Sequence, residues 1–140
     1  MDLLTATILF SLALAADYIR TGTLYIPQLF CLGIPNALNI ERNKIFVAEE
    51  VTFYFFDARG TLESTITGKY LTFNGAGKLV LEEQPDRNFG MRSHPGMYPR
   101  RTVVYKGEAI FELCADGSIG YESECEDAVG VTITYEDYIH

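Results

Sequence analysis

Few side chains in this sequence could carry out catalysis. His94 and His140 are the only histidines, and no G-x-S-x-G, H-E-x-x-H or C-x-x-C motif occurs in the 140 residues. A nucleophilic hydrolase needs a nucleophile next to a base that a third group orients. Two histidines cannot build a typical catalytic zinc site without help from carboxylates. We therefore expect the protein not to be an enzyme and to use no cofactor.

Carboxylates are numerous, but their spacing is irregular. Glu122, Glu124, Glu126 and Asp127 form an acidic stretch that lacks the ligand spacing of a calcium-binding loop. Paired carboxylates for glycoside hydrolysis stay open as an alternative. A small chain without tryptophan is a poor host for the aromatic-lined cleft that such enzymes use. The expectation is therefore that the protein holds no metal.

Three cysteines offer disulfide chemistry. Cys114 and Cys125 enclose ten residues that include Asp116-Gly117, a good hairpin turn, so we predict that these two cysteines are bonded across paired strands. Cys31 is then odd, and it is either buried or available for an intermolecular bond. A bridge from Cys31 to either of the other cysteines is the main alternative.

Aromatic and basic residues outside the strands are the remaining candidate binding groups. Tyr98 and Tyr121 could stack on sugar rings, and Arg100 and Arg101 belong to a run of five bases between residues 87 and 106. We take these four residues as the candidate binding site. The alternatives are a solvated loop for the arginines and, for the tyrosines, rings that cover a small core with their hydroxyls in water. Tyrosines 135 and 138 are also expected to be exposed.

The net charge of −8 makes nucleic acid an unexpected partner, because the phosphate backbone attracts basic proteins.

Strand patterns dominate the chain beyond its N-terminus. Residues 44–56 indicate two short strands interrupted at Glu49-Glu50, and the aromatic residues on both faces of the second strand predict that it is covered on both sides. Residues 36–43 look like a turn, and residues 82–101 look like one long loop.

A local pattern of a strand, a glycine turn and a second strand occurs three times, around Gly60, Gly77 and Gly117. The intervals of 17 and 40 residues exclude a regular solenoid repeat. We predict an all-β fold, a single antiparallel domain of about 8–10 short strands. A β-sandwich and a trefoil-like barrel are both compatible with these signals.

The N-terminus resembles a secretory signal. Residues 3–15 form an apolar run that is too short to span a bilayer comfortably and ends in a small-x-small cleavage site. We expect a signal peptide over residues 1–15 and a single β-rich domain over residues 16–140. The expected location is extracellular, with no membrane span.

Several short motifs resemble fungal secreted cell-wall proteins, of the phialide-associated type and of the yeast cell-wall mannoprotein type. They include Val51-Thr52-Phe53-Tyr54-Phe55 before a glycine turn, Asp116-Gly117-Ser118-Ile119, and Asp127-Ala128-Val129-Gly130-Val131. The resemblance covers roughly residues 45–135. It implies a small secreted wall-associated protein with no catalytic residues, whose partners are wall polysaccharide or other wall proteins. A secreted lectin-like module, effector or inhibitor is the alternative.

Overall fold

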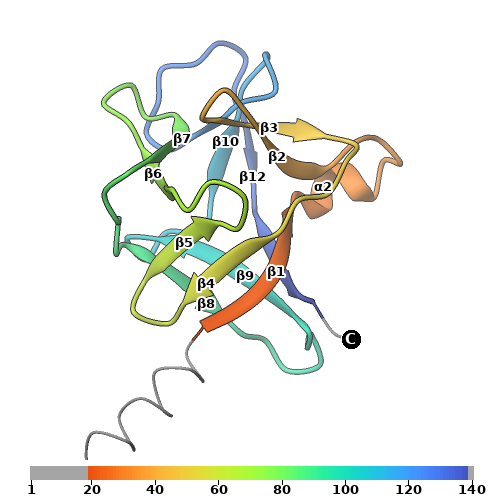
Figure 1. Ribbon diagram of the computed structural model, residues 1–140. Helices are drawn as coiled ribbons and strands as arrows, with labels where there is room; N and C mark the ends of the chain where they lie inside the picture. Colours follow the sequence, from red (N-terminus) through yellow and green to blue (C-terminus); the bar gives the residue numbers. More distant parts are fainter. Residues whose placement is uncertain (1–18, 139–140) are drawn as a thin grey trace, which may run out of the picture.

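The computed structural model describes residues 19–138, which form short antiparallel strands and one short helix (Figure 1). The expected signal peptide and His140 lie outside the described residues. The elements are β1 (Ile19–Tyr25), α2 (Pro27–Phe30), β2 (Ala37–Glu41), β3 (Lys44–Ala48), β4 (Tyr54–Asp57), β5 (Thr61–Ser64), β6 (Tyr70–Phe73), β7 (Leu79–Glu82), β8 (Phe89–Arg92), β9 (Arg100–Tyr105), β10 (Phe111–Leu113), β11 (Ile119–Gly120), β12 (Val129–Val131) and β13 (Thr134–Asp137).

Six of these strands close into a barrel. β1 pairs with both β4 and β13, β4 pairs with β5, and β9 pairs with both β13 and β8. The ring closes where the amide of Phe89, at the start of β8, donates to the carbonyl of Gly60, just before β5, at 3.0 Å. A closed ring leaves none of these six strands with a free edge.

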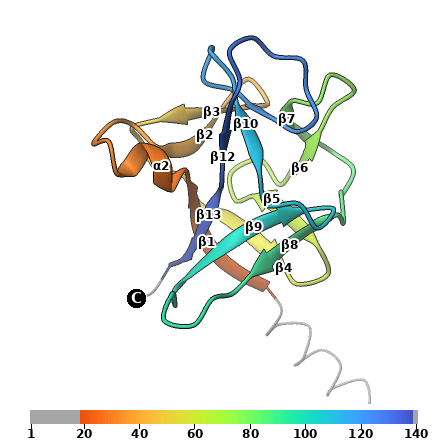
Figure 2. The same cartoon turned by 180° about the vertical axis from the view of Figure 1, so that it is seen from behind.

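Three hairpins cap one end of the barrel. They are β2–β3, β6–β7 and β10–β11, and they lie above the barrel strands in Figure 1 and, from behind, in Figure 2. The turns of the second and third hairpins use the same backbone bonds. The amide of Gly77 donates to the carbonyl of Asn74, and the amide of Gly117 donates to that of Cys114, both at 2.9 Å.

A cyclic set of three backbone hydrogen bonds joins the hairpins. The amide of Leu81 donates to the carbonyl of Asn43 at 2.8 Å, and the amide of Tyr121 donates to that of Gly77 at 2.8 Å. The amide of Val47 donates to the carbonyl of Gly117 at 3.0 Å and completes the cycle. Each donor lies four residues after the turn residue of its own hairpin. A six-stranded barrel capped by three hairpins with this threefold relation is a β-trefoil.

The core repeats the same threefold relation. Corresponding positions of the cap hairpins and of three barrel strands hold side chains that are at most 3% exposed: Leu38, Leu71 and Phe111; Ile45, Leu79 and Ile119; Leu24, Leu62 and Val103. Tyr54 lies fully buried among them, and its hydroxyl donates to the carbonyl of Leu38 at 2.8 Å. This bond satisfies a polar group in an apolar interior and ties the barrel to the cap.

The predicted all-β, single-domain fold is confirmed, and between a sandwich and a trefoil-like barrel the pairings select the barrel. The described residues hold thirteen strands, more than the expected eight to ten. Residues 37–41 form a strand where a turn was predicted, because Ala37 and Leu38 are buried in the cap. The expected long loop over residues 82–101 is also wrong, since β8 lies within it.

Gly22 provides a sharp test of barrel packing. A methyl group at this position in β1 would lie 2.5 Å from Cζ of Tyr135, whose ring crosses it from β13. We expect Gly22→Ala to lower the free energy of unfolding by about 2–3 kcal/mol, because an overpacked core must shift the backbone or the ring. Urea denaturation measures the loss.

Gly75→Ala is the matched control. Gly75 lies in the β6–β7 turn, and a methyl group there meets no heavy atom within 4 Å. This variant should keep the wild-type free energy of unfolding within about 0.5 kcal/mol. Equal losses in the two variants would contradict the packing argument.

Candidate functional site

The open end of the barrel, opposite the cap, carries three of the four residues predicted to bind. Tyr98 lies on the loop between β8 and β9 and is 70% exposed, and Arg100 is exposed at the start of β9. Arg101 is mostly covered, with a side chain 16% exposed that pairs with Asp137 at 3.2 Å. Tyr98 and Arg100 are therefore presented to solvent, whereas Arg101 stabilises the barrel.

Tyr121, the fourth predicted residue, lies in the cap, apart from this group. It is half-buried after β11, with its ring centroid 5.5 Å from that of Phe73 and 5.0 Å from that of Tyr105. Its amide also takes part in the cyclic set of cap bonds. The structure therefore separates Tyr121 from Tyr98 and places it in an aromatic cluster that packs against the core.

Tyr135 is buried, contrary to the expectation that it is exposed. It is 0% exposed because β13 is a barrel strand with neighbours on both sides, β1 and β9. Burial, followed by the nearby charge of Asp137, raises the pKa of the Tyr135 hydroxyl above its usual range. Asp137 is itself flanked by Arg20 at 3.6 Å and Arg101 at 3.2 Å. This charged group joins three neighbouring strands, with Asp137 and Arg101 largely covered and the Arg20 side chain 47% exposed.

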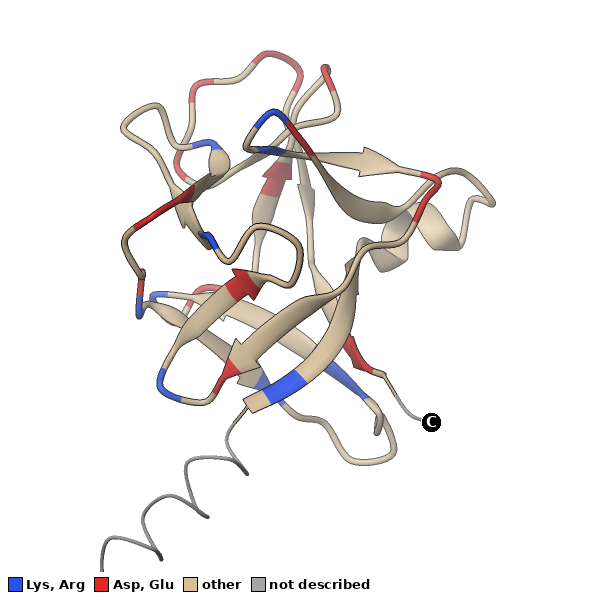
Figure 3. Ribbon diagram, viewed as in Figure 1, with Lys and Arg blue, Asp and Glu red and all other residues tan. Residues whose placement is uncertain are grey.

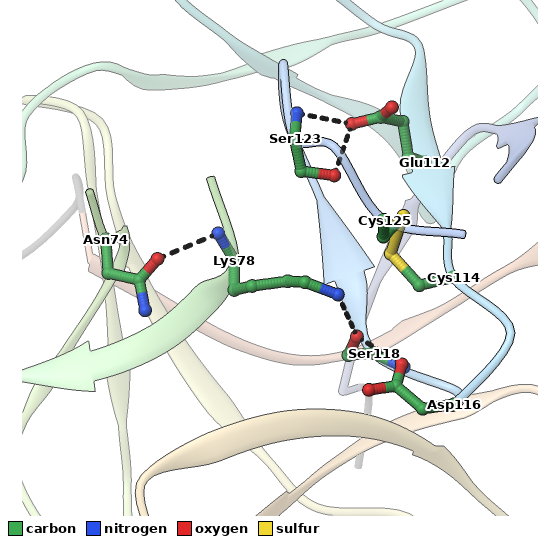
Figure 4. The surroundings of a disulfide bond; sticks show 8 residues. All are labelled: Asn74, Lys78, Glu112, Cys114, Asp116, Ser118, Ser123 and Cys125. Atoms are coloured by element: carbon green, nitrogen blue, oxygen red, sulfur yellow. Dashed lines mark hydrogen bonds between the residues drawn. A yellow bond between two sulfur atoms is a disulfide. The ribbon is translucent and has the colours of Figure 1, made fainter. Parts of the chain in front are cut away.

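The predicted disulfide between Cys114 and Cys125 is confirmed (Figure 4). It attaches the acidic segment 121–127 to the end of β10. Nearby, the backbone amide and hydroxyl of Ser123 both donate to Oε1 of Glu112 at 2.8 Å. Lys78 Nζ donates to the hydroxyl of Ser118 at 2.8 Å and links two cap hairpins. In residues 19–138 no three metal-ligating side chains are gathered as a metal site requires.

Two surface grooves were not identified from the sequence. The larger, of ≈ 1020 Å³, runs between the β2–β3 turn and the segment from β7 to β8. Its lining mixes charges of both signs, including Arg42, Lys44, Lys69, Glu82 and Arg87. This lining has no aromatic side chain, and its four bases and three acids leave no dominant charge.

Asp86 is one of the residues that line this charged groove, and its hydrogen bonds fix the segment before β8. Its Oδ2 accepts the hydroxyls of Thr72 at 2.7 Å and Tyr105 at 2.6 Å, and its Oδ1 accepts the backbone amide of Asn88 at 3.1 Å. Partial burial acts to raise the pKa of Asp86, but these hydrogen bonds outweigh it and hold the pKa below its usual range. Asp86 is therefore an ionised anchor for the loop that precedes β8.

The second groove, of ≈ 520 Å³, lies on the outer wall of the barrel. We call it the aromatic groove, and it is lined by Thr21, Phe53, Phe55, Thr65 and Tyr138. Phe53 is 37% exposed and Tyr138 is 51% exposed, and their rings meet edge to face at 5.1 Å. No charged side chain lines it.

The surrounding strands position these aromatic residues. Tyr54 and Phe56 of β4 point into the barrel, so Phe53 and Phe55 point outward by strand alternation. The hydroxyl of Thr65 donates to the carbonyl of Phe53 at 2.9 Å, and the amide of Tyr138 donates to that of Thr21 at 2.8 Å. The prediction that β4 is covered on both faces is wrong, since its outer face is left partly exposed.

Acidic and basic residues are interspersed over the molecule. Figure 3 shows basic residues on the barrel strands and turn of the open end and also on the β2–β3 turn of the cap, and acidic residues on several loops of the cap and also on barrel strands. At the open end Arg59 pairs with Asp57 at 2.8 Å, and Arg20 and Arg101 face Asp137. These pairs neutralise much of the basic charge there, so Arg100 is the more available cation.

In comparisons with known proteins, no family model, no curated protein and no solved structure matches the chain. Within residues 19–138, no helix is long and apolar enough to cross a bilayer.

Asp86 predicts a specific pH dependence of stability. Its pKa is lower in the folded state than the usual value near 4, so the stabilisation it provides is present above about pH 4 and is lost as pH falls through the lower folded pKa. Asp86→Asn should therefore destabilise the protein near pH 7 by about 1–2 kcal/mol. In urea denaturation at pH 3, the difference in the free energy of unfolding between this variant and the wild type should be smaller than at pH 7.

Glu83→Gln is the control, because Glu83 is exposed on the same loop. This variant should follow the wild-type stability within about 0.5 kcal/mol at both pH values. If Asp86→Asn lowers the free energy of unfolding by the same amount at both pH values, the role assigned to the ionised carboxylate is contradicted.

Proposed function

We propose that the protein is an extracellular, non-enzymatic binding protein whose aromatic groove holds a neutral cell-wall polysaccharide. The observation that carries the proposal is the exposed pair of Phe53 and Tyr138 in a groove lined only by aromatic residues and threonines. Sugars offer apolar C–H faces that pack on aromatic rings and hydroxyls that bond to polar neighbours.

The chemistry of the lining favours an uncharged ligand. A charged saccharide gains affinity from ion pairs, and the aromatic groove has no side chain to form one. The hydroxyl of Thr65 donates to the Phe53 carbonyl, which leaves its oxygen able to accept a hydrogen bond from a sugar hydroxyl. Apolar rings beside a few fixed polar groups are typical of small-ligand sites.

The position of the aromatic groove favours an internal stretch of a polymer. It lies on the outer wall of the barrel, where β1 and β4 pair and Tyr138 follows β13, so it is a surface groove and not a closed cavity. A chain of sugars can lie across such a surface and continue beyond it at both ends. This supports a wall polysaccharide over a single sugar.

An extracellular location is supported by the disulfide between Cys114 and Cys125, since such bonds persist in oxidising compartments. The expected signal peptide and the resemblance to fungal wall proteins point the same way. Together they make an insoluble wall polymer the natural ligand class for the aromatic groove.

The test is co-sedimentation with insoluble β-glucan and chitin. Wild-type protein should sediment with at least one polymer, and Phe53→Ala should weaken binding about tenfold, which corresponds to about 1.4 kcal/mol. Phe53 is 37% exposed and packs on Tyr138, so the variant should lose some stability, and a thermal unfolding curve must show that it is folded at the temperature of the binding assay.

Two control variants separate the aromatic groove from other surfaces. Ile110→Ala removes an exposed apolar side chain elsewhere, and Lys69→Ala alters the charged groove. Both should bind as wild type does. If Lys69→Ala loses binding while Phe53→Ala keeps it, the ligand site is the charged groove and the proposal fails.

A second candidate function is binding of an extracellular protein at the open end, as an inhibitor or effector would. Tyr98 is 70% exposed and Arg100 is exposed on adjoining parts of the loop and strand. An aromatic residue next to an arginine is typical of the residues that dominate protein interfaces.

This candidate predicts inhibition of a secreted protease that cleaves after arginine. Arg100→Ala should weaken the inhibition at least tenfold in a titration of protease activity, because it removes an exposed cation. Arg59→Ala is the matched control, since Arg59 is exposed at the same end but pairs with Asp57. Absence of inhibition by the wild-type protein, or equal inhibition by both variants, would rule out this role for Arg100.

A further inference from the structure

An apolar protrusion stands out from the side of the trefoil (Figures 1 and 2). It consists of α2 and the turn that follows it, residues 27–34. Phe30 is 67% exposed, Leu32 is 71% exposed and Ile34 is 45% exposed. Cys31, a free and exposed cysteine, stands between Phe30 and Leu32 in the sequence.

The protrusion is held in a defined shape. The amides of residues 31–34 donate to carbonyls within the segment, for example Cys31 to Pro27 at 3.1 Å and Gly33 to Phe30 at 3.0 Å, and the amides of Leu29 and Phe30 donate to the carbonyl of Ile26, just before it. Gln28 is fixed to Thr132 by two hydrogen bonds, from Gln28 Nε2 to the Thr132 hydroxyl at 3.0 Å and from the Thr132 amide to Gln28 Oε1 at 3.2 Å. An apolar surface ordered before binding loses little conformational entropy when it is covered.

The sequence around the protrusion is free of charge. No Asp, Glu, Lys or Arg occurs between residues 21 and 40, although charged residues make up 21% of the chain. Figure 3 shows α2 and the turn that follows it without an acidic or basic residue. Two acidic residues lie near the base of the protrusion. At this base Ala37 of β2 pairs with Ala48 of β3, and Glu49 and Glu50 follow Ala48 in the sequence.

This absence of charge indicates which partner can cover the protrusion. The protein carries a net charge of −8, so two copies repel each other over most of their surfaces. The protrusion is a place where two copies can meet without bringing like charges together. An anionic membrane is a poor alternative, because the protrusion offers no Lys or Arg to the headgroups.

We propose that the protrusion is a self-association surface, on which two copies pack Phe30, Leu32 and Ile34 against each other around a twofold axis and join through a Cys31–Cys31 disulfide. In a twofold interface each residue near the axis meets its own copy. Because Cys31 is exposed between Phe30 and Leu32 in the sequence, a twofold axis through the protrusion brings it opposite the Cys31 of the second copy.

The covalent bond compensates for the small size of the surface. The exposed parts of the three apolar side chains amount to about 350 Å² per copy, against about 800 Å² in a standard stable interface. Packing alone would give a weak, transient dimer. It would nevertheless raise the effective concentration of one thiol near the other and so favour the disulfide.

Formation of the bond is an oxidation whose electrons go to a small-molecule disulfide. One Cys31 thiolate attacks this disulfide to form a mixed disulfide and releases one small thiol. The Cys31 thiolate of the second copy then attacks the sulfur of the first Cys31 and releases the second small thiol. Overall, two protein thiols are oxidised, one small-molecule disulfide is reduced to two thiols, and the protons are conserved.

The experiment measures the dimer in a glutathione redox buffer, with the full coding sequence produced through an oxidising secretory compartment. Non-reducing gels and light scattering should give a dimer for the wild type, and peptide mapping should find Cys31 bonded to Cys31. Cys31→Ser should be monomeric at micromolar concentration. Leu32→Asp keeps the thiol but places like charges at the axis, so its dimer equilibrium constant should fall at least tenfold.

Ile66→Asp is the matched control, since Ile66 is 75% exposed on a different loop, and it should dimerise as wild type does. The proposal is overturned if the wild type stays monomeric with Cys31 reduced or bonded to glutathione, or if Leu32→Asp dimerises as well as wild type, which would mean random oxidation. A monomer that binds phosphatidylcholine vesicles through the protrusion would also overturn it. No polysaccharide is present, so the result is independent of the function proposed for the aromatic groove.

Discussion

The cyclic set of backbone hydrogen bonds from Leu81 to Asn43, from Tyr121 to Gly77 and from Val47 to Gly117 is the interaction on which the rest of the fold depends. It joins hairpins that are far apart in the sequence and holds them over one end of the barrel. No side chain takes part, so these bonds do not fix the residue types of all three turns, although Gly77 has a positive φ and leaves no room for a Cβ beside the carbonyl of Tyr121. The core residues, by contrast, must fill the space beneath the cap, which explains why three sets of buried aliphatic and aromatic side chains repeat while the turns differ.

That tolerance also explains why the threefold repeat is hard to detect in the sequence. Gly77 and Gly117 occupy corresponding cap turns and adopt positive φ values of 77° and 84°. The first cap turn uses Arg42 and Asn43 at φ values of 51° and 63°, so no glycine marks it. Gly60, which has the same local pattern, belongs instead to the β4–β5 turn at the open end. Strand and turn chemistry therefore predict an all-β fold correctly, but the unequal intervals conceal the symmetry that distinguishes a trefoil from a sandwich.

Some features of the candidate sites follow from local sequence patterns, whereas others depend on contacts between strands that are distant in the sequence. The prediction that Cys114 is bonded to Cys125 is confirmed, but the expected position across paired strands is wrong, because the Asp116-Gly117 turn sets Cys114 opposite Ser118 and Cys125 lies between β11 and β12. Alternation separates the two faces of β4, but only the arrangement of the other strands decides that the face with Phe53 is left partly uncovered. Tyr135 was expected near the surface because it is close to the C-terminus. It is buried because the last strand pairs with the first, a contact between residues more than a hundred positions apart that no local pattern reveals.

The filled barrel restricts where function can be. Tyr54, Tyr135 and Phe111 are at most 1% exposed, so large side chains occupy the interior where a wider barrel would hold a ligand. Binding must then use the outer surface of a protein whose net charge is −8. The aromatic groove and the protrusion around Cys31 both combine exposed apolar side chains with an uncharged lining. Solvent exposure of such surfaces is unfavourable unless a partner covers them, and their different shapes suit different partners: a groove fits a thin polymer, and a protruding surface with an exposed thiol fits a second copy of itself.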